Sequence, residues 1–248
     1  MIFLSIINHN HDQMLINNKE ITNIAKKFTV VIKSNTKATI ELKEHCKKNN
    51  IQLLDASYNL GFGANNNYVF SYLKNTKKIK DSDYFLVINP DVTIKKEQLE
   101  NLLNHALELD AEIFTVNLFR DLEWTIPESS IKRFPTLLGP VKGLLQSKRR
   151  NDAYDKKNII KPTVIDWAAG SFLLFKKTAY ETLKGFDDKF FMYFEDVDIC
   201  RRAKINQMKI IYLPEIKATH KGAFNNRNIF SRHFLWYLKS YLIYHTGI

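Results

Sequence analysis

The chain has 248 residues, of which 45% are hydrophobic and 25% are charged. This composition is typical of a soluble globular protein that is long enough to bury a full core, and it excludes a disordered or fibrous chain. The formal net charge of +11 favours an anionic partner: a nucleotide, a nucleic acid or an acidic membrane surface. The two cysteines, Cys46 and Cys200, are not spaced as a metal-binding pair, and no apolar run is long enough to span a bilayer.

The first half of the chain alternates between short apolar runs and helical patterns. The sequence predicts buried strands at residues 3–7, 28–32, 51–54, 84–88 and 113–118. It predicts helices at residues 15–24, through Leu42 and Cys46, and at residues 68–74 and 99–109, with a glycine- and asparagine-rich loop at residues 58–67. This alternation predicts an α/β fold with a Rossmann-like, mostly parallel sheet flanked by helices.

Ligands of such a sheet bind beyond the carboxyl ends of its strands. Polar residues follow several of the predicted strands. We therefore expect Asn8, Ser34, Tyr58 and Asp91 to lie along one rim.

The regular alternation stops after residue 118. Residues 119–162 contain three prolines and the basic cluster Lys148, Arg149 and Arg150, and we expect a long irregular excursion that covers the site. Regular structure is predicted again as a strand at residues 172–175, a short helix at residues 180–183 and a last strand at residues 208–213. We expect Pro214 to end that strand, with His220 beyond it.

An acidic cluster marks the start of another predicted helix. In the segment FFMYFEDVDICRR, Glu195, Asp196 and Asp198 precede Arg201 and Arg202. One interpretation is that the carboxylates only cap the helix. The other is that one of them accepts a proton from an incoming hydroxyl group.

The carboxyl-terminal tail is rich in aromatic residues. In residues 228–245 the apolar side chains mostly recur at helical spacing among Arg232, His233 and Lys239. Such a helix either lies on a membrane surface or docks on the body of the protein, and the sequence leaves both open.

Asp91 follows Asn89 and Pro90 at the end of the fourth predicted strand. An aspartate there is a turn residue, a helix cap or a metal ligand. A hard cation that also binds a diphosphate needs only one or two protein carboxylates. With an imidazole from His220, the mixed oxygen and nitrogen set suits Mn²⁺ at least as well as Mg²⁺.

Five motifs in order carry a resemblance to a known family. They are NLGFGANNN, INPDV, DWAAGSFLL, GFDDKFFMYFEDVDICRR and the later His220. Together they resemble the family 2 glycosyltransferases of GT-A fold, and most of all the bacterial rhamnosyltransferases of O-antigen, lipopolysaccharide and other cell-surface polysaccharide synthesis. One departure concerns the nucleoside: Ser34 and Asn35 stand where many members carry an aspartate.

The resemblance implies roles for particular residues. Asp196 matches the usual base, with Glu195 and Asp198 in the same acidic motif, and Asp91 and His220 match metal ligands. The implied acceptor- and sugar-binding residues are Trp167, Gly170 and Ser171. The implied nucleotide-sugar-binding residues are Asn8, Asn35, Asn59, Gly63, Asn66, Asn67 and Asn89.

The implied activity is inverting transfer of a sugar, L-rhamnose from dTDP-L-rhamnose or another hexose from a UDP- or dTDP-sugar. The expected partners are a divalent metal (Mg²⁺ or Mn²⁺), a polyprenyl-diphosphate-linked saccharide acceptor and an anionic membrane surface, in a cytoplasmic protein that is peripheral on the inner face of the membrane. A basic nucleic-acid-binding protein is the alternative from another class, but no recognisable module supports it, and no nucleic acid is expected.

The implied organisation is one GT-A domain with a tail. We expect the domain at residues 1–222, divided into a nucleotide-binding half (1–118), the excursion (119–162) and an acceptor half (163–222). The helical tail occupies residues 223–248.

Overall fold

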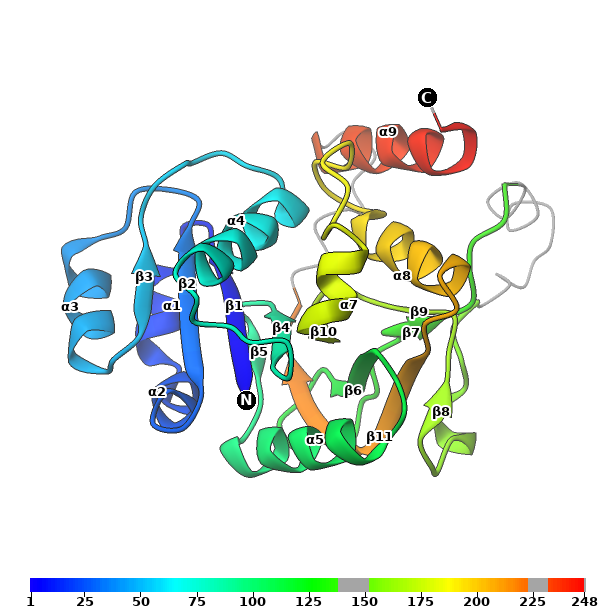
Figure 1. Ribbon diagram of the computed structural model, residues 1–248, viewed down its shortest axis with the longest axis horizontal. Coiled ribbons are helices and arrows are strands. Elements are labelled where there is room, and N and C mark those ends of the chain that lie inside the picture. The colour runs from blue at the N-terminus through cyan, green and yellow to red at the C-terminus, as the bar shows by residue number, and fades with distance from the viewer. Residues whose placement is uncertain (138–151, 223–231, 248) are drawn as a thin grey trace.

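The structure, a computed structural model, describes residues 1–137, 152–222 and 232–247. A mixed sheet runs through the molecule and has helices on both faces (Figure 1). Its strands are β1 (Ile2–Asn8), β2 (Thr29–Ser34), β3 (Gln52–Leu54), β4 (Tyr84–Ile88), β5 (Val92–Thr93), β6 (Ile113–Phe119), β8 (Thr163–Val164), β10 (Phe172–Lys176) and β11 (Ile210–His220).

The strand order is β3-β2-β1-β4-β10-β6-β11-β5, with β8 paired to β11. Strands β1 to β4 pair in parallel, and so do β6 and β11, which agrees with the predicted mostly parallel sheet. Strand β10 runs antiparallel to both β4 and β6. Its first residue, Phe172, therefore pairs with Ile88, the last residue of β4, and the start of β10 lies at the rim where its neighbours end.

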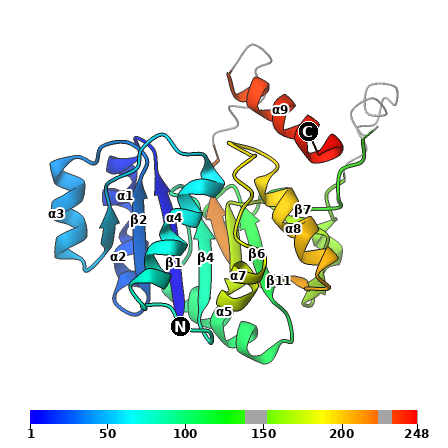
Figure 2. The same cartoon turned by 45° about the horizontal axis from the view of Figure 1, so that its top comes forward.

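The helices form two layers, which are visible from two directions (Figures 1 and 2). One core cluster packs β1 and its neighbours against α1 (Asp12–Asn17), α2 (Lys19–Ala25), α3 (Ile40–Lys48) and α5 (Lys96–Glu108). The other packs the opposite face against α4 (Phe62–Asn75), α7 (Lys177–Thr182) and α8 (Glu195–Ile205). Because both faces are covered, the central strands are buried along most of their length and are mostly apolar, as the sequence predicted.

Helix α4 begins earlier than predicted. Its first residue is Phe62, within the stretch expected to be a loop. The extended Gly61 precedes it, and the Phe62 amide donates to the Phe191 carbonyl (3.0 Å). The asparagines of this turn form hydrogen bonds inside the protein, which offsets their low helix propensity.

The last strand of the sheet is longer than predicted. Strand β11 continues through Pro214 to His220, and its register with β6 shifts between Leu213 and Lys217. An irregularity of this kind accommodates a residue that cannot donate to the ladder. The predicted end at Pro214 was wrong, and His220 is the last strand residue rather than a residue beyond it.

The helix predicted at residues 15–24 is two helices. Helices α1 and α2 meet at Asn18, whose side chain accepts a hydrogen bond from the Glu20 amide and caps α2 (3.2 Å). A residue that caps the second helix ends the first, because its backbone leaves the helical conformation.

The excursion predicted at residues 119–162 is partly regular. Strand β7 (Ile131–Lys132) pairs with β9 (Trp167–Ala168), and a short 3₁₀ turn follows at Lys156–Asn158. The basic cluster at residues 148–150 lies outside the described residues.

The carboxyl-terminal helix α9 (Arg232–Thr246) lies beside α8 and the segment that precedes it (Figure 2). Tyr244 packs with Phe190 and Phe194 in a small apolar cluster, and Ser240 donates to the Met192 carbonyl (2.9 Å). The docked interpretation of the tail is therefore observed for α9. None of the helices in the described ranges combines the length and the hydrophobicity needed to cross a bilayer.

Candidate active site

The rim of the sheet gathers most of the predicted polar residues. Asn8 and Ser34 are register partners at the ends of β1 and β2. Ser171 immediately precedes β10, and His220 ends β11. The antiparallel direction of β10 places its start among the ends of the other strands.

A short antiparallel pairing brings Asp91 and His220 together. Asp91 immediately precedes β5, and β5 pairs with the end of β11 so that Val92 is opposite His220. The imidazole Nε2 of His220 lies 3.3 Å from Asp91 Oδ1. These two residues are 129 positions apart in the sequence (220 − 91), and the fold brings their side chains into contact.

His220 lies between two carboxylates. Its Nδ1 is 2.9 Å from Glu128 Oε2, and the three side chains are largely buried. Burial opposes a charge on the imidazole, but the contacts with Asp91 and Glu128 raise the pKa of His220 to about 9. Burial also acts to raise the pKa of Asp91, but the hydrogen bond and positive charge from His220 lower it overall. In this arrangement a histidinium ion bridges the two carboxylates.

The same donor set is compatible with a divalent cation. A cation between Asp91 and Nε2 would release the Nε2 proton and leave Nδ1 hydrogen-bonded to Glu128, a common arrangement around metal-binding histidines. Across the described residues no group of three or more His, Cys, Asp and Glu side chains forms a metal site. Asp91 and His220 would supply two ligands, and diphosphate oxygens and water could supply others.

Asp196 is held by backbone amides at the start of α8. Its Oδ2 accepts from the Gly170 amide (2.9 Å) and its Oδ1 accepts from the Val197 amide (2.8 Å). Burial raises the pKa of Asp196, although these hydrogen bonds favour the ionised form. The residue is half-buried, and its carboxylate is more basic than usual.

Two consecutive residues connect this carboxylate to the Asp91 segment. The Gly170 amide donates to Asp196, and the Ser171 carbonyl accepts from the Asn89 amide (3.1 Å). An added Cβ on Gly170 would lie 3.2 Å from the Phe62 ring and 3.4 Å from Asp196 Cβ. The fold therefore brings the two acidic motifs to the same part of the rim, with Gly170 and Ser171 between them.

Glu195 differs from its neighbour. Its side chain is 6% exposed, and its Oε2 has no hydrogen-bond partner among the described residues. Burial and the nearby charge of Asp196 raise the pKa of Glu195 well above its usual value. A protonated, neutral Glu195 is the form that this environment favours.

Asp198 is engaged in a structural pair. Its Oδ2 accepts from Arg202 Nε (2.7 Å), and Arg202 also donates to the carbonyls of Leu183 and Gly185. This set of contacts ties α8 to the turn after α7. The predicted role of Asp198 in transfer stays a prediction.

The side chains of two predicted nucleotide-binding asparagines form hydrogen bonds within the protein. The Asn8 amide donates to Asp12 (2.7 Å) and Ser34 (3.0 Å). The Asn35 side chain accepts from the Leu60 amide and donates to the Leu60 carbonyl (2.8 and 2.9 Å). These contacts shape the rim and the loop before α4.

The NLGFGANNN segment likewise forms internal contacts. Asn66 accepts from Ser5 on β1 (2.7 Å), and Asn67 accepts from Tyr180 and from the Phe186 amide (2.8 and 2.9 Å). An added Cβ on Gly63 would lie 2.6 Å from Phe186 Cβ. These residues hold α4 against β1 and the 180–188 segment.

The remaining predicted site residues lie around the hydrogen-bonded groups described above. Asn59 is exposed in the loop before α4, and Asn89 is half-buried beside Asp91. The indole of Trp167 donates to the Arg133 carbonyl (2.9 Å), and the Lys132 ammonium lies 5.3 Å from its ring. Sequence reasoning missed Glu128, because it lies inside the excursion without any motif.

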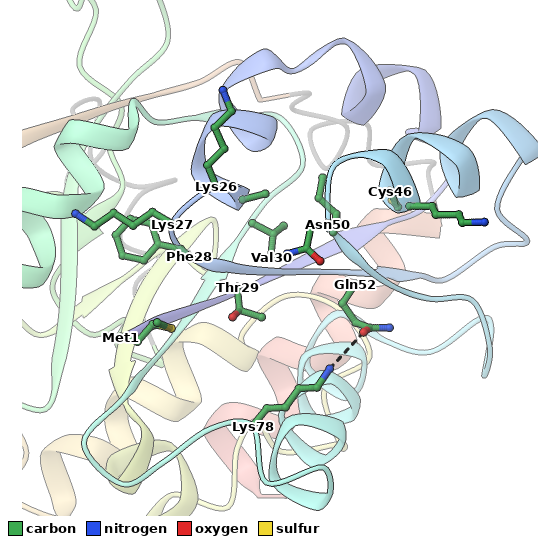
Figure 3. A pocket seen from close by; sticks show the side chains of 13 residues that line it. Met1, Lys26, Lys27, Phe28, Thr29, Val30, Cys46, Asn50, Gln52 and Lys78 are labelled. Carbon is green, nitrogen blue, oxygen red and sulfur yellow. Dashed lines mark hydrogen bonds between the residues drawn. The ribbon is translucent and has the colours of Figure 1, made fainter.

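A separate cavity of about 470 Å³ lies away from this rim (Figure 3). It is lined by Thr29, where β2 begins, and by Gln52, where β3 begins, so it lies at the opposite ends of the strands. Lys78 reaches Gln52 across it (3.4 Å). It includes none of the predicted site residues.

No profile of a known protein family matches the chain. The rhamnosyltransferase WbbL of Escherichia coli K12 is 30% identical over 97% of this chain and 90% of WbbL. The N-acetylglucosaminyl-diphospho-decaprenol L-rhamnosyltransferase of Mycobacterium tuberculosis H37Rv is 26% identical over 80% of this chain and 69% of its own. The low-salt glycan biosynthesis hexosyltransferase Agl10 of Haloferax volcanii is 25% identical over 87% of this chain and 65% of Agl10.

Solved structures share the fold at low sequence identity. Staphylococcus aureus TarS 1–349 has a TM-score of 0.58 and 15% identity, over 89% of this chain and 60% of that one. GalNAc-T7, crystallised with UDP, GalNAc and Mn²⁺, has a TM-score of 0.66 and 11% identity, over 98% of this chain and 47% of that one. These likenesses concern the fold.

Proposed function

The chain belongs to the rhamnosyltransferase family of GT-A glycosyltransferases, and we propose that it transfers L-rhamnose from dTDP-L-rhamnose to a lipid-linked saccharide with inversion at the anomeric carbon. The observation that carries the proposal is the link through Gly170 and Ser171, which joins Asp196 to the Asn89–Asp91 segment at the rim. This link supports the proposal because Asp196 and the Asn89–Asp91 segment both contact one short segment.

Asp196 acts as the general base of the proposed reaction. It accepts the proton of the acceptor hydroxyl as that oxygen bonds to the anomeric carbon and the bond to the diphosphate breaks. The amides of Gly170 and Val197 fix the orientation of its carboxylate. Burial makes this carboxylate more basic than an exposed aspartate.

Asp91 and His220 would hold a divalent cation on the diphosphate side of the site. Such a cation would supply charge stabilisation for the leaving diphosphate. Asp91 would offer a carboxylate oxygen, and His220 would offer Nε2, which faces Asp91. Mn²⁺ suits this mixed set at least as well as Mg²⁺.

The nucleoside binds along the ends of β1, β2 and β3. Asn8 and Asn35 shape this part of the rim, because their amide groups hold Ser34 and Leu60 in place. The backbone amide of the exposed Asn59 donates to the Asn35 carbonyl (3.1 Å). The amide groups of this surface can hydrogen-bond a pyrimidine diphosphate donor without selecting between dTDP and UDP.

The proposed acceptor is a polyprenyl-diphosphate-linked saccharide, which binds on the Asp196 side of the site. The Mycobacterium tuberculosis relative carries such an acceptor in its name. We place this chain on the inner face of the cell membrane, where such acceptors are presented to a cytoplasmic enzyme. Helix α9 exposes leucines beside the acceptor half and supplies a surface for that contact.

A donor screen tests the proposal. Release of dTDP or UDP should be measured across dTDP- and UDP-sugars with N-acetylglucosaminyl-diphospho-polyprenol as acceptor, with Mn²⁺ or with excess EDTA. We expect turnover with dTDP-L-rhamnose that EDTA abolishes and that Asp91→Ala lowers by roughly 10- to 1,000-fold. Full activity in EDTA would remove the cation from the mechanism.

Transfer of another hexose is the alternative outcome of this screen. It is favoured by the relative Agl10, a hexosyltransferase that is 25% identical over 87% of this chain. Preferential turnover of a UDP-hexose would identify it.

A further inference from the structure

Glu128 has an unassigned contact with the proposed cation site. Its Oε2 lies 2.9 Å from Nδ1 of His220, and the side chains are 12% and 11% exposed. An ionised carboxylate can only accept hydrogen bonds, so the Nδ1 nitrogen must donate. The other ring nitrogen is then the one that faces Asp91.

The chain around Glu128 holds its carboxylate in place. The Glu128 amide donates to the Leu118 carbonyl (2.9 Å), and its own carbonyl accepts from the Ser130 amide (2.9 Å). Pro127, the residue before it, forms a bridge with Phe119, the last residue of β6. The start of the excursion thus pairs with the end of β6. This pairing places the Glu128 carboxylate against His220 at the end of β11.

A partly buried lysine, Lys156, lies near Glu128. Lys156 donates to Ser130 Oγ (2.9 Å) and to the Leu118 carbonyl (3.3 Å). Burial lowers the pKa of Lys156 to about 8, and the negative charge of Glu128 acts in the opposite direction. The carboxylate is therefore placed between a lysine and the imidazole, and the lysine is hydrogen-bonded to the same segment that holds it.

We propose that Glu128 is a positioning residue that orients His220 so that Nε2 faces Asp91 and the diphosphate cation. The proposal rests on the proposed function, since it assigns Glu128 to the same cation site. A carboxylate behind a metal-binding histidine fixes the ring and raises its basicity, and losing it lowers metal affinity by about 10- to 100-fold. Glu128 acts through His220 and touches no reacting atom.

The test compares binding with and without Mn²⁺. We expect Glu128→Gln to weaken Mn²⁺-dependent dTDP binding, measured by titration calorimetry, by about 10- to 100-fold. Binding of dTDP in EDTA should not change. In a His220→Ala background, Glu128→Gln should have no further effect, because the residue through which it acts is missing.

A matched control uses the other histidine–glutamate pair. His105 Nε2 lies 3.2 Å from Glu215 Oε1, and Glu215 is in the middle of β11, five residues before His220. Glu215→Gln should leave Mn²⁺-dependent dTDP binding unchanged. Glu128→Asp keeps the charge but shortens the side chain, and it should give an intermediate loss if Glu128→Gln does not fold.

A second measurement is independent of the nucleotide. In the metal-free protein, side-chain ¹⁵N NMR shifts of His220 should change in Glu128→Gln, because Nδ1 loses its carboxylate partner. Unchanged shifts together with wild-type dTDP affinity, even with a lower melting temperature, would overturn the proposal and leave Glu128 as an anchor of its segment. A wild-type protein that binds neither dTDP nor UDP with Mn²⁺ would contradict the proposed function instead, and the NMR shifts would still decide the role of Glu128.

Discussion

At the scale of single residues, Asp196 combines a structural role and a proposed catalytic role, and a substitution can separate the two. Its carboxylate accepts two backbone hydrogen bonds near the start of α8, and it is the proposed proton acceptor. Asp196→Asn keeps the shape and one accepting oxygen but places an amide group against the second N–H. We expect a loss of about 1–2 kcal/mol in unfolding free energy, measured in urea.

The same variant should lose far more transfer than stability. We expect rhamnose transfer to fall about a hundredfold or more, while dTDP binding stays near the wild-type value. Asp198→Asn on the same helix is the matched control: it breaks the pair with Arg202 and should be less stable but retain more transfer than Asp196→Asn. Near-normal transfer by Asp196→Asn would contradict the assignment of Asp196 as the general base, and Glu195 would be the next candidate.

The neighbouring Glu195 leads to a prediction about pH. Its pKa is raised well above 4.5 in the folded state, chiefly by burial. Above the pKa of the unfolded chain, about 4.3 for glutamate, the folded state keeps a proton that the unfolded state has released. Rising pH therefore lowers the free energy of unfolding until the folded-state pKa is passed.

Glu195→Gln removes this contribution because glutamine does not titrate. Its melting temperature should exceed that of the wild type by more at pH 8 than at pH 5, measured by scanning calorimetry. Glu44→Gln on the exposed face of α3 should show no such difference. A constant difference between the Glu195→Gln and wild-type melting temperatures across this range would contradict a protonated Glu195.

At the scale of elements, the sequence predicted the strands better than the ends of the helices. Continuous apolar runs predicted β1, β2, β4 and β6 because strands covered on both faces need apolar residues at every position. The direction of β10 is set by pairing with strands distant in sequence, and no local pattern encodes it. The early start of α4 depends on a contact between Phe62 and Phe191, which is equally invisible in the local sequence.

The same distinction applies to the candidate site. Asp91 and Asp196 were selected from the sequence because one follows a predicted strand and the other lies at a predicted helix start, and His220 was selected with them through the resemblance. Their contacts with Gly170 and Glu128 come from tertiary packing. The asparagines after Gly61 were expected to bind a nucleotide, yet their amide groups are used to pack α4.

Asn67 gives a test of that structural use. Its side chain accepts from Tyr180 and the Phe186 amide and donates to the Phe186 carbonyl (2.8 Å). Asn67→Ala should lower the free energy of unfolding by about 2–4 kcal/mol, because it leaves several partly buried groups unpaired. Asn101→Ala, on the exposed face of α5, should change it little.

Nucleotide binding distinguishes the two interpretations of Asn67. If its role is structural, folded Asn67→Ala should bind dTDP with nearly wild-type affinity. A large loss of affinity at unchanged stability would restore the expected contact with the donor.

At the scale of the whole molecule, α9 has two different faces. Aromatic rings on one side contact the segment before α8: Phe194 lies 5.5 Å from Tyr237 and 5.3 Å from Tyr244 between ring centroids. On the other side Leu235, Leu238 and Leu242 are 63%, 44% and 50% exposed. Docking therefore uses only part of the helix and leaves a leucine stripe at spacings of three and four residues.

The leucine stripe suits the surface of an anionic membrane. The chain carries a net charge of +11, and Arg232 and Lys239 are exposed on the same helix. Apolar side chains and cations on one exposed helix are what interfacial helices combine. The docked face fixes the stripe relative to the acceptor half, so a membrane contact would also orient the site toward a lipid-linked acceptor.

Liposome sedimentation tests this orientation. The wild-type protein should pellet with vesicles that contain phosphatidylglycerol and should be released in part by high salt, because screening acts within about 10 Å at 0.1 M. Replacing Leu235, Leu238 and Leu242 with glutamine should abolish pelleting and leave turnover of a water-soluble acceptor intact. Leu107→Gln, which changes a 65% exposed leucine on α5, should pellet like the wild type, and equal pelleting of the triple variant would assign the membrane contact to another surface.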